Sequence, residues 1–537
     1  MEVKALAEAK VSYNSRKGSL AFLVTVMLCM AANALEVYQI SGDVTGGIDL
    51  LGMSETYYTD RLKGKDNKTI SGEVTHSAVT VENPFLLMGN HAGATAFNPS
   101  TKLDTIPIRI VDGGYWKYQS NDGGNANYRI KSGYGNLEME KGVFGANAIL
   151  LYGDAGGERS YLTVTNGCRL EIGTTIRVGL ETNDGSASGT LVLDGGEIVM
   201  YTVLELGRGP NNGTAPYNAS VNTAIVANAT MTLTASDGEN VVYMGRFGAN
   251  NGANRDSDRN VLILGEDGIL HAKGICRCRD PRGHVIFRGG TLELFRRGTN
   301  NNRDYAFENK DSGILEIEGD GAPIRIDVGD NDYQVISPYN DSTSSTILTG
   351  DGGFEKCGSG TLILNNIYNT VRASFRGGVA VDEGTLKLGA RGMIPATNML
   401  SVAENAVFDM SGYDVGLTGA VGAGVVTNSS ETATTLTLGY GDGDYAFSAA
   451  VGGGVLLVKK GTGTLTVSGN AANNNCDLDI TAGTVAFAAK NSSSYGNVTV
   501  RSGATLDISK CNFTCVSLVK ESGGTIKHKL GLSVIVR

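Results

Sequence analysis

One short phrase, Gly-Thr-Leu followed by a further strand-forming residue, returns along this chain of 537 residues. Clear copies begin at Gly189, Gly290, Gly360, Gly384 and Gly463, and looser copies begin at Gly483, Gly503 and Gly524. The starting positions advance by 24 residues from 360 to 384, then by 20, 20 and 21 residues from 463 to 524. A nearly fixed period of this size indicates a solenoid, and it is too short for a propeller blade.

The residues of the phrase explain how such a solenoid could hold together. In Thr464-Leu465-Thr466-Val467 the apolar and hydroxyl side chains alternate, so leucine and valine share one face of a strand. If they point inward, they pack on their equivalents in the next coil, and the stack buries a continuous core. Glycine before the strand permits a sharp corner with positive φ. We therefore expect an all-β chain folded as a parallel β-helix, with three short strands and three turns per coil.

Composition supports this fold class. Glycine contributes 75 of 537 residues, which is roughly twice its average usage of about 7%. Residues 161–179 and 189–209 repeat the pattern of short alternating strands closed by glycine in a looser form. An antiparallel sandwich would also show short strands with turns. The nearly constant step, and glycine corners in place of paired hairpin signals, favour the β-helix.

The N-terminus predicts export. Residues 16–34 contain Arg16 and Lys17, then an apolar run, then Ala32-Asn33-Ala34, which is the order of a secretory signal peptide cleaved after Ala34. The alternative is a membrane anchor, but the apolar run from 20 to 32 has only 13 residues, fewer than the roughly 20 that a membrane-spanning helix needs. We expect residues 1–34 to be removed and the mature chain, without a membrane span, to be secreted or held at the outer-membrane surface.

Net charge, cysteine content and histidine content limit the kinds of partner, disulfide and metal site that the chain can have. The chain carries a formal charge of −10, and removal of residues 1–34 leaves it at −12, which argues against nucleic acid as a partner. Seven cysteines remain after Cys29 is removed with the signal; they are expected to be core residues, with one incidental disulfide left open. Five scattered histidines predict no metal site, and no motif calls for a cofactor.

Two stretches, 353–389 and 453–488, resemble the autotransporter-associated β-strand repeat. That family's pattern is a glycine, a lysine, Gly-x-Gly-Thr-Leu, an asparagine-containing loop and a second Gly-Thr-Leu strand. Its first copy is carried by Lys356, Gly358, Gly360, Thr361, Leu362, Leu364, Gly384, Thr385, Leu386 and Gly389, and its second by Lys460, Gly461, Gly463, Thr464, Leu465, Val467, Gly469, Asn470 and Gly483. The resemblance implies a right-handed parallel β-helix, of the pectin-lyase-like kind, in a passenger on or released from a Gram-negative cell.

The expected organisation follows. After the signal peptide, residues 35–120 lack the Gly-Thr-Leu phrase and form an N-terminal cap or early coils of divergent sequence. Residues 121–345 form a glycine-rich β-helix with divergent coils, and residues 346–537 form the β-helix with the autotransporter-associated repeats. The sequence stops one repeat after Gly524, where a classical autotransporter would continue into a translocator barrel. We expect either a truncated passenger or export by another route.

A locally basic segment, 273–303, provides the candidate binding site. Its stretch "CRCRDPRGH" interrupts the strand pattern, so it is expected to form a projecting loop. Arg277, Arg279 and Arg282 in this loop suit a carboxylated or sulfated polysaccharide. The alternative is a charged loop that binds nothing.

Two acidic stretches have a possible chemical role. Asp327, Asp330 and Asp332 could bind calcium or supply an acid–base pair, and the alternative is a solvated turn between coils. The stretch 439–445, "GYGDGDY", is similar to a calcium-binding nonapeptide, but it is a single copy without tandem register. No residue is therefore assigned as catalytic.

The function expected from these observations is that of a non-enzymatic, adhesin-like surface protein. Its lateral faces would bind extracellular polysaccharide or a host or matrix protein weakly. A β-helical polysaccharide lyase or glycoside hydrolase is the alternative, and it should cluster two or three acidic residues with a lysine, arginine or histidine on adjacent coils of one face. A truncated passenger without independent function remains the third interpretation.

Overall fold

The computed structural model describes the chain in two compact units, Met1–Ala272 with Cys278–Gly283 (unit 1) and Lys273–Arg277 with His284–Arg537 (unit 2). The described residues are the named strands between 44 and 87, and 108–111, 114–117, 127–131, 137–139, 141–152, 159–180, 188–208, 221–234, 241–246, 259–277, 284–295, 305–309, 313–319, 322–336, 346–365, 373–452, 454–469, 471, 474, 476–488, 492–529 and 535–536. The predicted signal peptide, 1–34, lies outside them.

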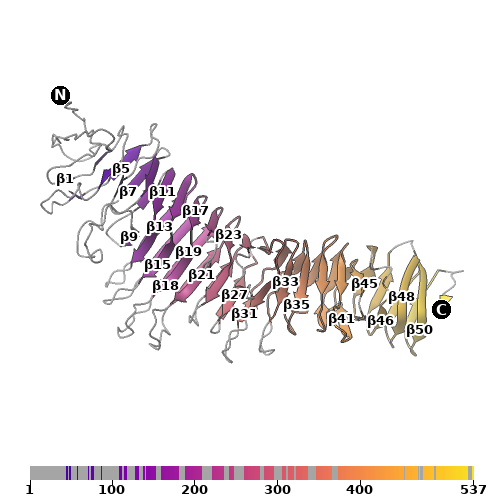
Figure 1. The fold of residues 1–537 in the computed structure, drawn as a ribbon. Coiled ribbons are helices and arrows are strands. Elements are labelled where there is room, and N and C mark those ends of the chain that lie inside the picture. The colour runs from indigo at the N-terminus through magenta and orange to yellow at the C-terminus, as the bar shows by residue number, and fades with distance from the viewer. Residues whose placement is uncertain are drawn as a thin grey trace, which may run out of the picture. The chain divides into compact units, whose positions relative to one another are not determined.

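Unit 1 is built from parallel strands that stack in three sheets (Figure 1). Each strand pairs with the strand three places later in the chain, so one lap contributes one strand to each sheet. Sheet 1A contains β8 (Gly114–Lys117), β11 (Gly142–Ala146), β14 (Cys168–Ile172), β17 (Glu197–Met200), β20 (Thr230–Leu233) and β23 (Ile269–Ala272). Sheet 1B contains β9 (Asn127–Lys131), β12 (Ala148–Tyr152), β15 (Thr175–Leu180), β18 (Val203–Arg208) and β21 (Val241–Arg246). Sheet 1C contains β13 (Arg159–Thr165), β16 (Ser188–Asp194), β19 (Val221–Ala227) and β22 (Arg259–Leu264).

In its described part, unit 1 has eight further strands outside these three sheets. They are β1 (Val44–Thr45), β2 (Ile48–Asp49), β3 (Tyr57–Tyr58), β4 (Ile70–Ser71), β5 (Val74–Ser77), β6 (Leu86–Leu87), β7 (Ile108–Val111) and β10 (Leu137–Met139). All their pairings are parallel: β1 with β4, β3 with β6, and β2, β5, β7 and β10 in one sheet.

The core of unit 1 follows from the alternation along each strand. In β16 the leucines Leu191 and Leu193 are fully buried, whereas Thr190 and Val192 face outward and are half-buried. Leu191 pairs in register with Ala224 of the next lap, and both side chains are buried. Full burial of one aliphatic side chain contributes about 1.5–3 kcal/mol, so repetition over successive laps stabilises the stack.

Unit 2 continues the same construction with four parallel sheets. Sheet 2A contains β26 (Thr291–Leu294), β29 (Ile324–Asp327), β32 (Phe354–Cys357), β34 (Val379–Val381), β36 (Met399–Val402), β39 (Gly419–Gly422), β42 (Tyr445–Phe447), β45 (Thr464–Val467), β47 (Thr484–Phe487), β49 (Thr505–Asp507) and β51 (Thr525–Lys527). Sheet 2B contains β24 (Gly274–Arg277), β27 (Tyr305–Asn309), β30 (Tyr333–Ile336), β33 (Thr361–Leu364), β35 (Thr385–Leu388), β37 (Val407–Asp409), β40 (Val425–Thr427) and β43 (Ala450–Val451). Sheet 2C contains β25 (His284–Phe287), β28 (Gly313–Ile317) and β31 (Thr346–Thr349). Sheet 2D contains β38 (Val415–Leu417), β41 (Thr434–Leu438), β44 (Val455–Lys459), β46 (Asp477–Ile480), β48 (Ser492–Val500), β50 (Asn512–Lys520) and β52 (Ile535–Val536).

The all-β prediction is confirmed, and the long parallel sheets fit a parallel β-helix. The expectation of three strands in every coil is wrong in the C-terminal laps. From β44 onward each strand pairs with the strand two places later, so a lap contributes one strand to sheet 2D and one to sheet 2A. The nine-residue strands β48 and β50 pair in two runs, Ser492–Tyr495 with Asn512–Cys515 and Asn497–Val500 with Ser517–Lys520.

The Gly-Thr-Leu phrases stack within a series but not across the whole chain. Thr464, Thr484, Thr505 and Thr525 are in register on consecutive strands of sheet 2A, as the period predicts. Thr361 and Thr385 also pair, but on sheet 2B. The copy that begins at Gly189 lies on sheet 1C. The phrase thus marks a glycine corner followed by a strand, and this unit is used on more than one side of the coil.

Two lysines of unit 2, Lys356 and Lys459, are buried at glycine-rich corners. Lys356 is fully buried, and its Nζ donates to the carbonyl oxygens of Gly358, of Gly360 (2.6 Å) and of Glu383 (2.8 Å). Because Glu383 belongs to the next lap, one ammonium group ties two corners together.

The second stretch, 453–488, also has a buried lysine at a corner, but it is residue 459 and not the expected residue 460. Lys459, not Lys460, is buried, and its Nζ donates to the carbonyl oxygens of Lys460 (2.5 Å) and Gly461 (2.8 Å), with a longer contact to Ala482 (3.4 Å). Lys460 is exposed and lies over the Tyr440 ring. Lys459, and not Lys460, is therefore the counterpart of Lys356. The spacing agrees, since Lys356 and Lys459 each lie two residues before a glycine, Gly358 and Gly461.

The described cysteines are core residues, as expected. Cys168, Cys357, Cys476, Cys511 and Cys515 are buried and free. In the described part of the chain, no helix has the length and apolar character that a membrane crossing requires.

Candidate functional site

The predicted polysaccharide-binding arginines are largely outside the described residues. Arg277 ends β24, where only its backbone is described, and Arg279 and Arg282 lie in the stretch 278–283 that the structure does not describe. The proposed role of these three side chains therefore stays a prediction.

The acidic stretch after β29 makes the corner of a coil. Asp327 accepts a hydrogen bond from the Gly329 amide at 2.8 Å, and Asp332 accepts one from the Thr361 amide of the next lap at 3.1 Å. Asp330 accepts a bond from its neighbour Asn331. Asp327 and Asp332 hold backbone amides, and the three carboxylates do not form one of the metal-binding groups found among the described residues. The turn interpretation accounts for them.

The stretch 439–445 also forms a corner, and its aspartates also accept hydrogen bonds from backbone amides. Asp442 accepts a hydrogen bond from the Thr462 amide (2.9 Å), and Asp444 accepts one from the Thr464 amide (2.6 Å). The hydrogen bond from the Thr462 amide is the main cause that lowers the pKa of Asp442 below its usual range. Each aspartate joins its own corner to the next lap. This structural contact accounts for the presence of the aspartates in this stretch.

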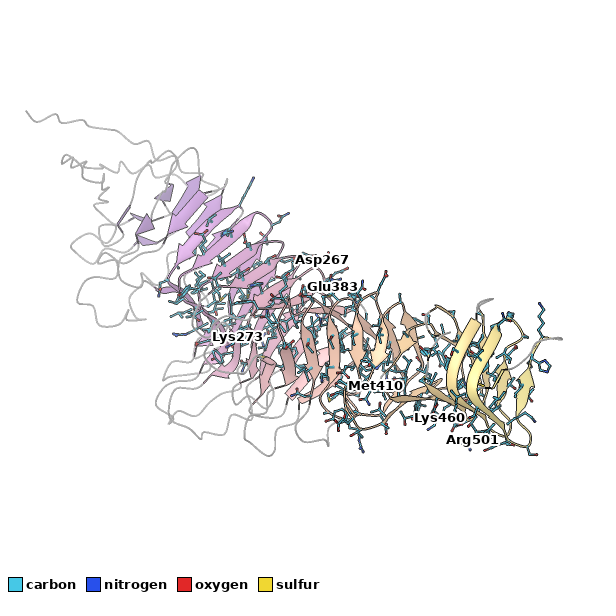
Figure 2. All side chains as sticks on the ribbon, turned by 45° about the vertical axis from the view of Figure 1, so that its right-hand side comes forward. Asp267, Lys273, Glu383, Met410, Lys460 and Arg501 are labelled. Carbon is cyan, nitrogen blue, oxygen red and sulfur yellow. The ribbon has the colours of Figure 1, made fainter. Side chains whose placement is uncertain are left out.

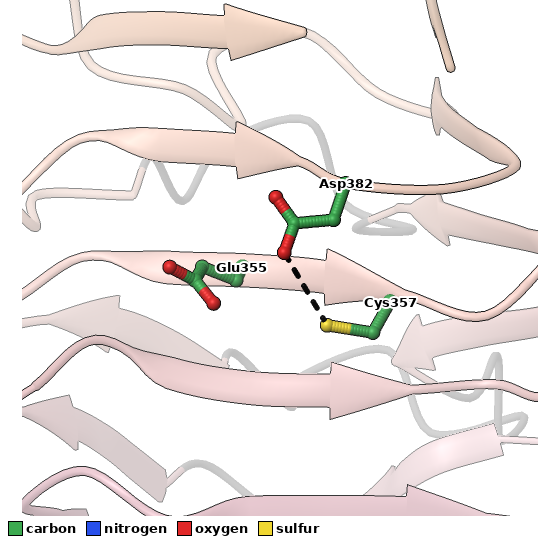
Figure 3. A group of neighbouring side chains, drawn as sticks. All are labelled: Glu355, Cys357 and Asp382. Carbon is green, nitrogen blue, oxygen red and sulfur yellow. Dashed lines mark hydrogen bonds between the residues drawn. The ribbon is translucent and has the colours of Figure 1, made fainter. Parts of the chain in front are cut away.

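Three side chains on sheet 2A lie close enough together to form a candidate functional site. Glu355 and Cys357 belong to β32, and Asp382 follows β34 on the neighbouring lap (Figure 3). One oxygen or sulfur atom of each residue lies within 4.8 Å of those of the other two. The Cys357 thiol points to Asp382 Oδ2 at 4.0 Å, and a backbone bond from the Asp382 amide to the Lys356 carbonyl fixes the register between the two laps.

The electrostatics of this group follow from its partial burial. Burial first, and then the nearby Asp382 carboxylate, raise the pKa of Glu355, against the opposing effect of Arg325. Arg325, directly opposite on β29, contacts Glu355 Oε2 at 3.1 Å. Burial also raises the pKa of the Cys357 thiol to about 11, so the thiol stays protonated near neutral pH.

This arrangement has two possible chemical uses. Two carboxylates and a thiol are ligand types that divalent cations accept, but a thiol must lose its proton to coordinate well, and the raised pKa of Cys357 opposes this loss. Two neighbouring carboxyl groups with unequal environments can also act as acid and base on a glycosidic bond. Acidic groups from adjacent laps meet an arginine here, as they also do at Arg501 and at Arg169.

Sequence reasoning did not find this group because its members are far apart in the chain. Cys357 and Asp382 are 25 residues apart, and the laps here are longer than those after 463. Only the exact register between laps brings them together. One signal in the sequence could have pointed to this group: two charged residues, Glu355 and Lys356, are adjacent in the short strand β32. Glu355 is half-buried and Lys356 is buried.

Comparison with known proteins adds one finding. Over 144 residues, the chain is 34% identical to the adhesin BmaC autotransporter of Brucella suis biovar 1 (strain 1330). The chain resembles part of an autotransporter adhesin. The matched stretch is 26% of this chain and only 4% of that adhesin, so the similarity supports a relationship to autotransporter passengers and leaves the whole protein's activity open. No protein-family model matches the chain, and no solved structure gives a significant match.

Proposed function

We propose that this chain is an exported, adhesin-like passenger whose stacked coils form a non-enzymatic binding scaffold at the bacterial surface. The observation that carries the proposal is the partial similarity to an autotransporter adhesin, together with long parallel sheets that stack lap upon lap. In the proposal the helix is right-handed and of the pectin-lyase-like kind, as the resemblance to the autotransporter-associated repeat implies. Residues 1–34 direct export, and the mature chain begins at Leu35.

The use of the charged side chains supports a scaffold. Arg501 donates to Asp479 on the preceding lap (2.9 Å) and to Glu521 on the following lap (2.7 Å). Arg177 and Glu205 make the same kind of contact between β15 and β18 at 2.7 Å. Groups that join laps in this way contribute to the stack.

Export and adhesion can be tested together on the full chain in a Gram-negative host. We expect the processed chain to start at Leu35 by mass spectrometry, and to be accessible on intact cells or present in the medium. Cells that carry it should adhere to polysaccharide-coated or matrix-protein-coated surfaces more than cells that do not. An unprocessed chain retained in the cytoplasm would contradict export, and unchanged adhesion by a displayed chain would contradict the adhesin role.

The arginine-rich loop is the proposed contact for an anionic glycan. Substitution of Arg277, Arg279 and Arg282 by alanine should abolish retention on heparin or polyuronate columns, because clustered guanidinium groups bind carboxylates and sulfates. The matched control replaces three exposed cations elsewhere, Arg391, Lys510 and Lys529, and removes the same charge. Equal loss of retention in both variants would show a general charge effect, and no loss in the first would exclude this loop.

The Glu355 and Asp382 pair favours a second candidate, a glycoside hydrolase. In retaining glycosidases the two carboxyl groups are about 5–5.5 Å apart, and here the ligand atoms lie within 4.8 Å. In that mechanism Glu355, with its raised pKa, would donate the proton and Asp382 would act as the nucleophile. Release of reducing ends from a polysaccharide, lost in both Glu355→Gln and Asp382→Asn, would establish this function. A truncated passenger predicts neither adhesion nor hydrolysis.

A further inference from the structure

The corner between sheets 1C and 1A in unit 1 contains a polar groove that none of the sites above uses. It has a volume of about 500 Å³ and is lined by Gly196, Glu197, Asn228, Ala229, Thr230 and Asp267. It is a shallow feature that opens to solvent. Figure 2 labels Asp267 on this part of the molecule, where its side chain is exposed.

The groove exists because three successive corners differ in size. The first corner contributes Gly196, and the second contributes Ala229, whose side chain is buried. A β-carbon added to Gly196 would come within 2.8 Å of the Thr165 carbonyl oxygen. The third corner contributes Asp267, which has a positive φ of 50°. Three laps spaced about 4.8 Å apart make the groove about 10 Å long.

Backbone hydrogen bonds between the laps hold this lining in place. The Asn228 amide donates to the Glu266 carbonyl at 2.8 Å, and the Ile269 amide donates to the Ala229 carbonyl at 2.7 Å. The side chains are also oriented: Asn228 Nδ2 donates to Asp194 at 2.9 Å, and Glu197 accepts from Arg169 at 2.6 Å. A preformed lining loses less entropy when a ligand binds.

The polar groups that remain determine which ligand fits. Among the described residues, nothing hydrogen-bonds to the Asp267 carboxylate or to the Thr230 hydroxyl, and the Asn228 amide oxygen is also unused. Arg169 already neutralises Glu197. The groove therefore offers acceptors and one hydroxyl, and none of its six described lining residues is a cation. Sugar hydroxyls both donate and accept, whereas a carboxylated or sulfated sugar would meet the uncompensated Asp267.

We propose that this groove binds a short segment of a neutral polysaccharide, with Asp267 and Asn228 accepting hydrogen bonds from sugar hydroxyls and Thr230 bonding to a third. The inference rests on the proposed adhesin function and assigns it a ligand class and a place. It is distinct from the arginine-rich loop, which suits anionic glycans.

The test uses the full chain and an array of neutral oligosaccharides of glucose, galactose, mannose and N-acetylglucosamine, followed by calorimetry with the best binder. We expect Asp267→Gly and Thr230→Val each to weaken binding at least fivefold. Glycine keeps the positive φ at 267, and valine keeps the shape of threonine. The matched controls, Asn405→Gly at another corner with positive φ (69°) and Thr232→Val on the same strand, should bind as the parent does.

Each other outcome overturns the proposal. No binding to any neutral oligosaccharide, unchanged binding in both groove variants, or binding of Ca²⁺ alone that Asp267→Gly abolishes would each exclude a neutral-glycan site. Beads coated with the parent and with Asp267→Gly separate this proposal from the adhesin function. If both adhere equally, the groove assignment fails and the adhesin role stands; if the soluble chain binds glycan but coated beads do not adhere, the adhesin role fails.

Discussion

At the scale of single residues, the buried lysines are the least replaceable polar groups of the repeats. Lys459 donates to two or three part-buried corner carbonyls, and these acceptors lose their donor once the side chain is gone. An unsatisfied buried acceptor costs about 1–3 kcal/mol. We expect Lys459→Met to lower the free energy of unfolding by that amount or more in urea titrations. The exposed neighbour provides the control: Lys460→Met should unfold close to the parent, and similar losses in both would refute the corner role of Lys459.

The same burial predicts a pH effect in the alkaline range. Burial lowers the pKa of Lys356 from 10.5 to about 8. Between those values the unfolded chain binds more protons than the folded chain, so stability from this group rises with pH over that window. Urea midpoints measured at several pH values from 7.5 to 10.5 should show a smaller rise in Lys356→Met than in the parent. Identical slopes would mean that the ammonium keeps its proton in the folded state.

The raised pKa of Cys357 predicts a chemical property. With a pKa of about 11, the thiol is almost entirely protonated at pH 8, and only the thiolate reacts with alkylating agents. We expect iodoacetamide to leave Cys357 unmodified in the folded chain and to modify it in urea, as peptide mapping would show. Rapid modification of the folded chain at pH 8 would instead indicate a thiolate. Cys357, Glu355 and Asp382 would then be a stronger candidate for a metal site.

At the scale of the coil, glycine has two separable roles. Gly461 has a φ of 73°, and a β-carbon there would come within 2.4 Å of the carbonyl oxygens of Gly439 and Gly441. Gly503 has a φ of 77° with nothing within 4 Å, and Gly452 has neither constraint. Alanine at 503 should cost about 1–2 kcal/mol for the left-handed backbone, alanine at 461 should cost more, and alanine at 452 should cost little.

Urea unfolding of the three alanine variants checks this order. Equal losses at 461 and 503 would show that the neighbouring coil moves aside without cost, and that backbone conformation alone selects glycine. A large loss of stability in Gly452→Ala would indicate that any alanine in place of glycine destabilises the chain, whatever its φ or its neighbours.

The coil is also the scale at which sequence and structure can be compared. The stacking of Thr464 on Thr484 followed from the period, because equal laps fix the register. The place of Thr361 on a different sheet did not follow, since laps of 24 and 20 residues distribute their strands differently. The site at Glu355 and Asp382 depends on that same register and so could not be predicted from the sequence. The groove at Asp267 depends on the size of side chains in three separate corners, which no repeat pattern encodes.

At the scale of the whole molecule, carboxylates form much of the connection between laps. They accept backbone amides at corners, as Asp414 does from Thr435 (2.8 Å) and Asp477 does from Asn497 (2.7 Å). They also pair with arginines across the sheets. A chain with more acidic than basic residues thus uses several of its described acids in structural contacts.

This use of carboxylates predicts sensitivity to acid. The hydrogen bond from the Thr462 amide lowers the pKa of Asp442 below 3.8, and the hydrogen bond from Arg501 lowers the pKa of Glu521 below 4.5. A group with a lowered folded pKa contributes stability above its unfolded pKa, and loses it as pH falls through the folded value. Urea midpoints should therefore be level from pH 7 to 5 and fall below pH 4.

Asparagine at 442 keeps an acceptor for the Thr462 amide but cannot be protonated in this range, and glutamine at 521 does the same for Arg501. The variant Asp442→Asn/Glu521→Gln should therefore start with lower stability at pH 7 and lose less of it between pH 5 and 3. If its loss matches that of the parent, the acid sensitivity arises from other groups, and the carboxylates at these corners act through shape alone. If it loses less, the charge on the acids is what joins one lap to the next.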